Sequence, residues 1–151
     1  MCTGIAKRSL SIFLGRSGAT VQAFKDFMKG IGSLALGWQL WIALMVGLNM
    51  IAPLAFLSHL EAQVTLAAIL LSATTGLILT KVQGFTKLLG LMHVYWLALV
   101  PFLYSRLESA SSSELFFNWM LSVIVVNSLS LVIDTADVIQ YFRERNRLRA
   151  S

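Results

Sequence analysis

The chain has 151 residues and a net charge of +5 at pH 7, but only 13% of its residues are charged and 57% are hydrophobic. Soluble globular domains carry about 25% charged residues, so this composition excludes an ordinary water-exposed surface and indicates a membrane protein. The length allows a single domain. The one cysteine, Cys2, excludes an internal disulfide and a multi-cysteine metal site within one chain.

The first 35 residues are too polar to cross a membrane. Between residues 5 and 31, apolar side chains alternate with basic ones at near-helical spacing, which is typical of an amphipathic helix in the cytoplasmic leaflet. Gly15 and Gly18 are expected to divide this helix. The apolar stretch at residues 10–14 is too short for a signal peptide. We expect residues 1–35 to lie on the lipid surface or to dock onto a partner protein.

Four apolar runs follow, and each is close to the roughly 20 residues that a helix needs to cross a bilayer. They cover residues 36–57, 62–80, 88–104 and 115–139, and the third is slightly short. The helical pattern of the last run continues to Arg147, which leaves residues 148–151 as a tail. The sequence therefore predicts an all-α fold, with one four-helix transmembrane bundle over residues 36–147.

The charges predict the direction of the chain in the membrane. If both termini are cytoplasmic, the basic residues of the N-terminal segment, of the loop at residues 81–87 and of the tail all lie inside. Only Arg106 then lies outside, together with Glu61, Glu108 and Glu114. This arrangement satisfies the positive-inside rule. It predicts cytoplasmic termini and a positive charge that contacts lipid headgroups, and it argues against nucleic acid as a partner.

Small residues and prolines indicate how the helices pack. One stripe of small residues recurs every four positions in the second run, at Ala68, Ser72 and Gly76. Such a stripe allows close helix contact, which we expect within the chain rather than in a homodimer. Pro53 and Pro101 lie toward the outer ends of the first and third runs. Each should bend its helix and free a carbonyl group, which Asn49 or a hydroxyl is expected to satisfy.

The fourth run has one polar face that extends from mid-membrane to the inner surface: Asn127, Ser130, Asp134, Asp137 and Tyr141. Polar side chains at membrane depth are costly and normally point into the bundle. Asp134 lies toward the inner edge of the hydrocarbon layer. Asp137 is expected at the interface, where it is solvated or paired with Arg143, Arg145 or Lys81.

The third run places His93 at a depth similar to that of Asp134. His93 lies six residues beyond Lys87, and a rise of about 1.5 Å per residue puts it roughly 9 Å inside. Trp96 lies near the same helix face. The two helices are antiparallel, but topology alone does not decide whether His93 and Asp134 touch.

Three functions are compatible with these polar residues. They could form a structural network that fixes the helix order, or a site for quinone or another small amphipathic ligand at His93, Asp134 and Trp96, with Asn127 and Ser130 nearby. They could also carry protons in a small transporter. A single membrane histidine cannot provide bis-histidine haem ligation, and one histidine with one carboxylate falls short of a metal site.

Catalytic motifs such as GxSxG, HExxH or a phosphate-binding loop do not occur in the sequence. The chain is small and its loops are short. The leading expectation is therefore an accessory subunit of a larger inner-membrane complex, without catalytic activity of its own. Its partners would be the lipid bilayer and either other membrane subunits or further copies of itself.

Two stretches resemble a known family. They are GFTKLLGLMHVYW at residues 84–96, which precedes Pro101, and NSLSLVID at residues 127–134, which continues to DVIQY at residues 137–141. They resemble an uncharacterised family of small four-helix bacterial inner-membrane proteins, over most of the chain after Trp38. The resemblance implies the same topology and points to the same polar residues, but it implies no activity.

Overall fold

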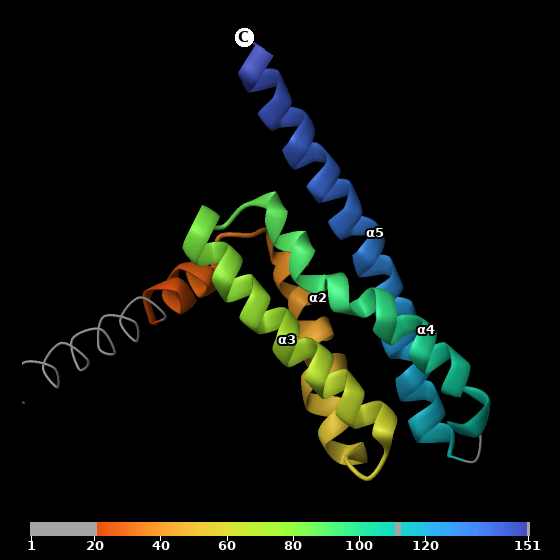
Figure 1. Cartoon of the computed structure of the whole chain (residues 1–151). Helices are drawn as coiled ribbons and strands as arrows, with labels where there is room; N and C mark the ends of the chain where they lie inside the picture. The colour runs from red at the N-terminus through yellow and green to blue at the C-terminus, as the bar shows by residue number, and fades with distance from the viewer. Residues whose placement is uncertain (1–20, 111–112, 151) are drawn as a thin grey trace, which may run out of the picture.

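The computed structural model describes residues 21–110 and 113–150, which are almost entirely helical and contain no strand. Figure 1 shows the arrangement of these helices. The expectations that concern residues 1–20, including Cys2 and the helix break at Gly15 and Gly18, lie outside the described residues. Of the amphipathic segment, residues 21–32 are described and form a helix.

Eight further helical segments follow in chain order: α2 (Leu36–Val46), η1 (Gly47–Ile51), η2 (Ala52–Phe56), α3 (Leu60–Gln83), η3 (Lys87–Tyr95), α4 (Trp96–Arg106), η4 (Glu108–Ala110) and α5 (Glu114–Ala150). The segment η1 is a π-helix, and η2, η3 and η4 are 3-10 helices. Four stretches are long and apolar enough to cross a membrane: Leu36–Phe56, Leu60–Gln83, Lys87–Arg106 and Glu114–Leu148. The expected all-helical fold with four long apolar helices is confirmed.

The third stretch is longer than the sequence predicts. It begins at Lys87 and ends at Arg106, and its first nine residues form the 3-10 helix η3. A 3-10 helix rises about 2.0 Å per residue, against about 1.5 Å in an α-helix. Nine residues of η3 therefore cover roughly 18 Å instead of roughly 14 Å, which compensates for the short apolar run. The same geometry puts His93 roughly 12 Å beyond Lys87, deeper than the sequence predicts.

The second stretch also begins earlier than expected. Helix α3 starts at Leu60, so Glu61 lies in its first turn and is buried rather than exposed in a loop. An acidic side chain is favourable there because it faces the positive end of the helix dipole. At the other end, Gly84 has φ of +73° and stops the helix. A side chain would be strained in this conformation.

Several polar side chains lie inside the molecule, and many large apolar side chains lie on its surface. Seven polar residues are buried: Asn49, Glu61, Thr65, Ser72, Thr80, Asn127 and Ser130. Large apolar side chains such as Leu97 and Val132 are more than half exposed. In water this distribution would be unfavourable, whereas a surrounding lipid phase favours it.

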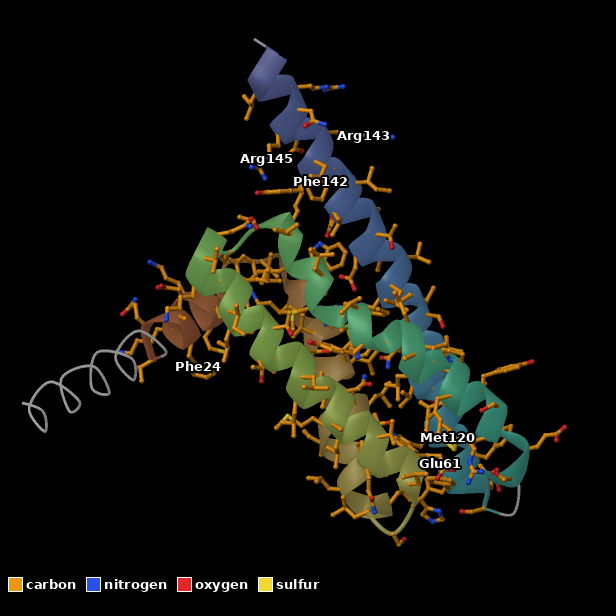
Figure 2. All side chains as sticks on the ribbon, viewed as in Figure 1. Phe24, Glu61, Met120, Phe142, Arg143 and Arg145 are labelled. Carbon is orange, nitrogen blue, oxygen red and sulfur yellow. The ribbon has the colours of Figure 1, made fainter. Side chains whose placement is uncertain are left out.

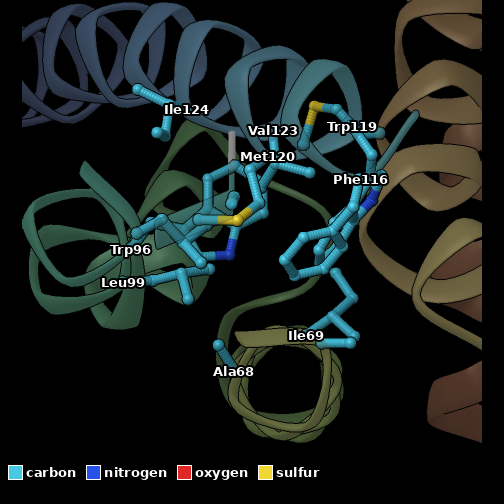
Figure 3. Packing of buried hydrophobic residues seen from close by; sticks show 13 residues of the cluster. Ala68, Ile69, Trp96, Leu99, Phe116, Trp119, Met120, Val123 and Ile124 are labelled. Carbon is cyan, nitrogen blue, oxygen red and sulfur yellow. The ribbon is translucent and has the colours of Figure 1, made fainter. Parts of the chain in front are cut away.

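The apolar core lies between α3, α4 and α5. Trp96, Leu103, Met120 and Val123 are completely buried there, and Figure 3 shows Trp96 and Leu99 facing Met120 and Val123 across this core. The three small residues Ala68, Ser72 and Gly76 are also buried. A methyl group on Gly76 would lie 3.0 Å from the Met92 sulfur, so the small face of α3 packs closely against η3 within the chain.

Pro53 changes the helical register of the first stretch. In the π-helix η1, the Ala52 N–H donates to the Gly47 carbonyl five residues earlier. The same spacing would pair the Leu48 carbonyl with the nitrogen of Pro53, which carries no hydrogen. The Trp119 Nε1–H donates to this carbonyl instead, at 3.0 Å. The freed carbonyl is therefore satisfied by an indole from α5, and not by Asn49 or a hydroxyl as expected.

Helix α5 extends beyond the other helices, and Figures 1 and 2 show its C-terminal part projecting from the bundle. Near the start of this part, the Lys87 Nζ donates to the Glu144 Oε1 at 2.7 Å and the Tyr141 hydroxyl donates to the Gln83 Oε1 at 3.0 Å. The helix continues past Arg147 to Ala150. Residues 142–148 are all exposed, and we call this segment the α5 arm.

Candidate functional site

The polar site lies where η3 passes between α3 and α5, and η3 contacts both helices extensively. Gly90 is at the closest approach to α5. A methyl group at this position would lie 3.0 Å from both the Asp134 Cβ and the Asp134 carbonyl oxygen. Because backbone atoms cannot swing aside, the absent side chain of Gly90 is what lets η3 come this close to Asp134.

The structure brings His93 and Asp134 together. The His93 Nδ1 lies 2.8 Å from the Asp134 Oδ2, and the two side chains are 12% and 17% exposed. The Ser130 Oγ lies one turn earlier on α5, at 3.4 Å from the same oxygen. It is also 3.6 Å from the Met45 sulfur. The carboxylate thus holds the imidazole in one orientation, at the edge of a buried polar path along α5.

Trp96 fixes the plane of the histidine ring. The two rings stack with centroids 4.0 Å apart and an interplanar angle of 19°. Residues three apart eclipse one another in a 3-10 helix, which places the side chain of Trp96 directly over His93. The second ring nitrogen of His93, Nε2, has no hydrogen-bond partner among the described residues. It is the ring atom left to bind another molecule.

Two buried polar atoms near the centre of the bundle have no hydrogen-bond partner within the described part of the chain: the Trp96 Nε1 and the Ser72 Oγ. Figure 3 shows the Trp96 indole nitrogen turned into the core, between Met120 and Ala68. Stacking against His93 and complete burial therefore position this indole, with no hydrogen bond of its own.

Four of the five residues predicted for the site lie together, but Asn127 does not. Its side chain exchanges two hydrogen bonds with that of Asn49. The sequence analysis did not include Asn49 in the polar group. The available signal was its place near the middle of an apolar run, which it shares with Asn127.

Tyr95, which follows the site on η3, bonds to α3 instead: its hydroxyl lies 3.0 Å from the Thr75 Oγ1. This bond and the His93–Asp134 pair tie η3 to both of its neighbouring helices. The η3 segment is therefore held from two sides at the level of the site.

At the end of the bundle from which the α5 arm projects, the ion pair expected as one alternative for Asp137 is not formed among the described residues, which leaves the alternative of solvation. Asp137 is half-buried and forms no ion pair with Arg143, Arg145 or Lys81 in the part of the chain described. Arg143 and Arg145 are exposed on the α5 arm, as Figure 2 shows. The cation that pairs at this level is Lys87, which bonds to Glu144 and, at 3.2 Å, to Gln140.

No group of three or more His, Cys, Asp or Glu side chains that could hold a metal ion occurs within residues 21–110 and 113–150. Comparison of the chain with protein-family models, with curated proteins and with solved structures gave no significant match.

Proposed function

We propose that the chain is a multi-pass membrane protein that binds a small amphipathic molecule with a hydroxyl group on a ring, of the quinol type, at His93. The observation that carries this proposal is the bond between His93 Nδ1 and Asp134 Oδ2 at 2.8 Å, which leaves Nε2 as the available ring nitrogen. The apolar surroundings favour a lipophilic ligand that arrives through the membrane.

The membrane and its orientation are part of the same proposal. Lys81 and Lys87 lie at the end of the bundle from which the arginine-rich α5 arm projects, and Glu61 lies at the other end, as Figure 2 shows for Glu61, Arg143 and Arg145. This division of charge supports cytoplasmic termini, and the membrane that we propose is the bacterial inner membrane. His93 then lies on the cytoplasmic side of the hydrocarbon layer.

The pair determines which ligand group fits. When Asp134 is ionised, it accepts the hydrogen of Nδ1, and the neutral imidazole presents a lone pair at Nε2. A lone pair accepts a hydrogen bond from a hydroxyl but repels a carbonyl oxygen. We therefore expect the reduced, hydroxyl-bearing form of a quinone to bind more tightly than the oxidised form. The flat indole of Trp96 stabilises the orientation of the ring that makes this distinction.

The test uses decylubiquinol, kept reduced, and decylubiquinone as probes, with the purified full chain in detergent. Calorimetric titration should show tighter binding of the quinol. His93→Ala and Asp134→Asn should each weaken quinol binding about tenfold or more, since a hydrogen bond to a charge-supported group contributes about 1.5–3 kcal/mol. Asp137→Asn is the matched control, since it removes a carboxylate three residues further along α5.

Two results would contradict the proposal. One is equal binding of the two redox forms. The other is a quinol affinity in His93→Ala and in Asp134→Asn that equals the affinity of the wild type and of the control Asp137→Asn. Because Asp134→Asn preserves the shape of the side chain, its circular dichroism and elution from size exclusion should match the wild type. A change in affinity is then attributable to the charge.

A second candidate function, a non-catalytic subunit of a larger membrane complex, is favoured by the α5 arm. Residues 142–148 are exposed on every side, and they combine Arg143, Arg145 and Arg147 with the half-exposed ring of Phe142. A helix that projects from a bundle with basic and aromatic side chains suits a partner with an acidic surface.

Native mass spectrometry tests this second candidate, on protein gently extracted from its own membrane at natural expression level. A complex of defined stoichiometry that dissociates in the Arg143→Glu, Arg145→Glu double variant would support the subunit function. A monomer or homo-oligomer that is unchanged by this double variant would argue against it.

A further inference from the structure

A second polar cluster lies at the end of the bundle opposite the α5 arm, where residues 57–59 approach residues 106–110 and Ser113. A cavity of about 280 Å³ opens here, lined among others by Ser58, His59, Glu61, Arg106, Ser113 and Phe116. Figure 2 shows Glu61 at this end of the molecule. The sequence analysis assigned these residues to loops and to topology, and gave them no binding role.

The cluster contains an ion pair in which the two partners differ in exposure. The Arg106 Nε donates to the Glu61 Oε1 at 2.8 Å, and the side chains are 49% and 7% exposed, respectively. The buried carboxylate therefore anchors the guanidinium at the rim of the cavity. The other N–H groups of Arg106 have no acceptor among the described residues.

One wall of the cavity is flat and aromatic. The His59 ring stacks on Phe116 with centroids 4.2 Å apart and an interplanar angle of 27°. The Ser109 hydroxyl donates to the Arg106 carbonyl at 2.6 Å and so holds the backbone of the arginine in place. Ser58 and Ser113 also line this space, and their hydroxyls have no protein partner in the described residues.

The charges of the cavity select a class of ligand. A simple anion would bind the guanidinium but would be repelled by Glu61, and a simple cation would be attracted to Glu61 but repelled by Arg106. A zwitterion avoids both conflicts, because its anionic oxygens accept from Arg106 while its ammonium group approaches the carboxylate. Planar guanidinium groups are especially suited to phosphate and carboxylate oxygens.

We propose that this cavity binds a zwitterionic phosphate-and-ammonium group of the ethanolamine phosphate type. Two sources carry this chemistry: the headgroup of a phospholipid and a free small molecule. The cavity lies at the rim of the apolar helices, which is the level of lipid headgroups if the chain spans a bilayer. This proposal is independent of the quinol site, because the two sites have no residue in common.

The test is native mass spectrometry of the delipidated full chain in detergent, titrated with dioleoyl phosphatidylethanolamine or dioleoyl phosphatidylglycerol. The ethanolamine lipid should be retained several-fold more than the glycerol lipid. Arg106→Lys preserves a charge opposite Glu61 but removes the planar group of donors, so it should reduce retention about tenfold without unfolding the protein. Lys81→Gln, which removes an exposed cation from the other end, is the control.

Soluble phosphoethanolamine distinguishes the two sources. If it binds and displaces the ethanolamine lipid, the headgroup of a lipid is the ligand, and if it binds while the lipid is not retained, the ligand is a free molecule. Both results support a zwitterion site. The proposal would be overturned if phosphatidylglycerol is retained as well as or better than a retained ethanolamine lipid, if Arg106→Lys leaves the preference unchanged, or if neither lipid is retained and soluble phosphoethanolamine does not bind.

Discussion

Asn49 and Asn127 are 78 residues apart in sequence, and their side chains exchange two hydrogen bonds in the interior of the bundle. The Asn49 Nδ2 donates to the Asn127 Oδ1 at 2.9 Å, and the Asn127 Nδ2 donates back to the Asn49 Oδ1 at 2.8 Å. Both residues are completely buried. The Asn49 Nδ2 also donates to the Met45 carbonyl at 3.0 Å, so the pair joins the first apolar stretch to α5 at one fixed register.

Removal of one partner should cost more than removal of both. Asn127→Leu leaves the buried Asn49 Oδ1 without its donor and one hydrogen of the Asn49 Nδ2 without its acceptor, which should lower the free energy of unfolding by about 1–3 kcal/mol. In the Asn49→Leu, Asn127→Leu double variant no amide is left unsatisfied, so its loss should be smaller than the sum of the single losses. Reversible unfolding in mixed micelles measures all four states of this cycle.

The exposed Asn118 on the same helix provides the control. Asn118→Ala removes an amide of the same type from the surface, where it should change stability by less than about 0.5 kcal/mol. Strictly additive losses at Asn49 and Asn127 would contradict the reciprocal pair.

The bond from Trp119 to Leu48 should depend on Pro53. Trp119→Phe leaves the Leu48 carbonyl without its donor at 3.0 Å and should cost about 1–2 kcal/mol. In a Pro53→Ala background, the new backbone N–H can pair with this carbonyl, so the same tryptophan substitution should cost less. The two stabilities, measured in the same micelles, give the difference directly. If Trp119→Phe cost the same stability in both backgrounds, the bond from Trp119 to Leu48 would not depend on Pro53.

The depth of polar residues was predictable because it depends on counting along the chain. The distance of His93 from Lys87 and the polar face of α5 were sufficient to place His93 and Asp134 at similar levels, and the structure brings their side chains within 2.8 Å. The 3-10 rise of η3, which puts His93 deeper, was not predictable in this way. Four long apolar helices were also predictable, since length and hydropathy alone specify them.

Helix register was not predictable, because it depends on partners far along the chain. The sequence placed Trp96 near the His93 face, but it did not predict the 3-10 geometry of η3 that stacks the two rings. From the sequence alone, Gly90 is an ordinary residue of low helix propensity. Its role emerges only when Asp134 lies against it. Likewise, the Leu48 carbonyl in the π-helix before Pro53 accepts its hydrogen bond from Trp119, which lies 71 residues further along the chain. Local periodicity contains no information about either contact.

The α5 arm should be held by the Lys87–Glu144 ion pair. The pair is exposed, so it contributes less than about 1 kcal/mol and is screened by salt. Spin labels at Val82→Cys and Arg147→Cys, in a Cys2→Ser background, measure the distance between the end of α3 and the arm. Lys87→Glu should broaden this distance distribution at low salt, and adding Glu144→Lys should narrow it again. If Lys87→Glu left the distance distribution unchanged, the bond between Tyr141 and Gln83 would be sufficient to hold the arm without the ion pair.

Gly90→Ala should separate η3 from α5 at the site without a substitution of His93 or Asp134 themselves. The added methyl group would lie 3.0 Å from the Asp134 Cβ and carbonyl oxygen and 3.1 Å from its Cα, so η3 and α5 must move apart by a few tenths of an ångström. Overpacking of this kind costs about 1–3 kcal/mol. It should also lengthen the bond between His93 and Asp134, which nitrogen-15 NMR of the His93 ring detects as a changed Nδ1 signal.

Gly37→Ala is the matched control, because nothing lies within 4 Å of a methyl group at that helical position. It should leave the His93 signal unchanged and should be neutral or stabilising by up to about 1 kcal/mol, since alanine favours helix over glycine. If Gly90→Ala behaved like Gly37→Ala in both measurements, close contact between η3 and α5 would not be what positions the His93–Asp134 pair. Flexibility of the His93 and Asp134 side chains would then be sufficient to keep their hydrogen bond when η3 and α5 move apart.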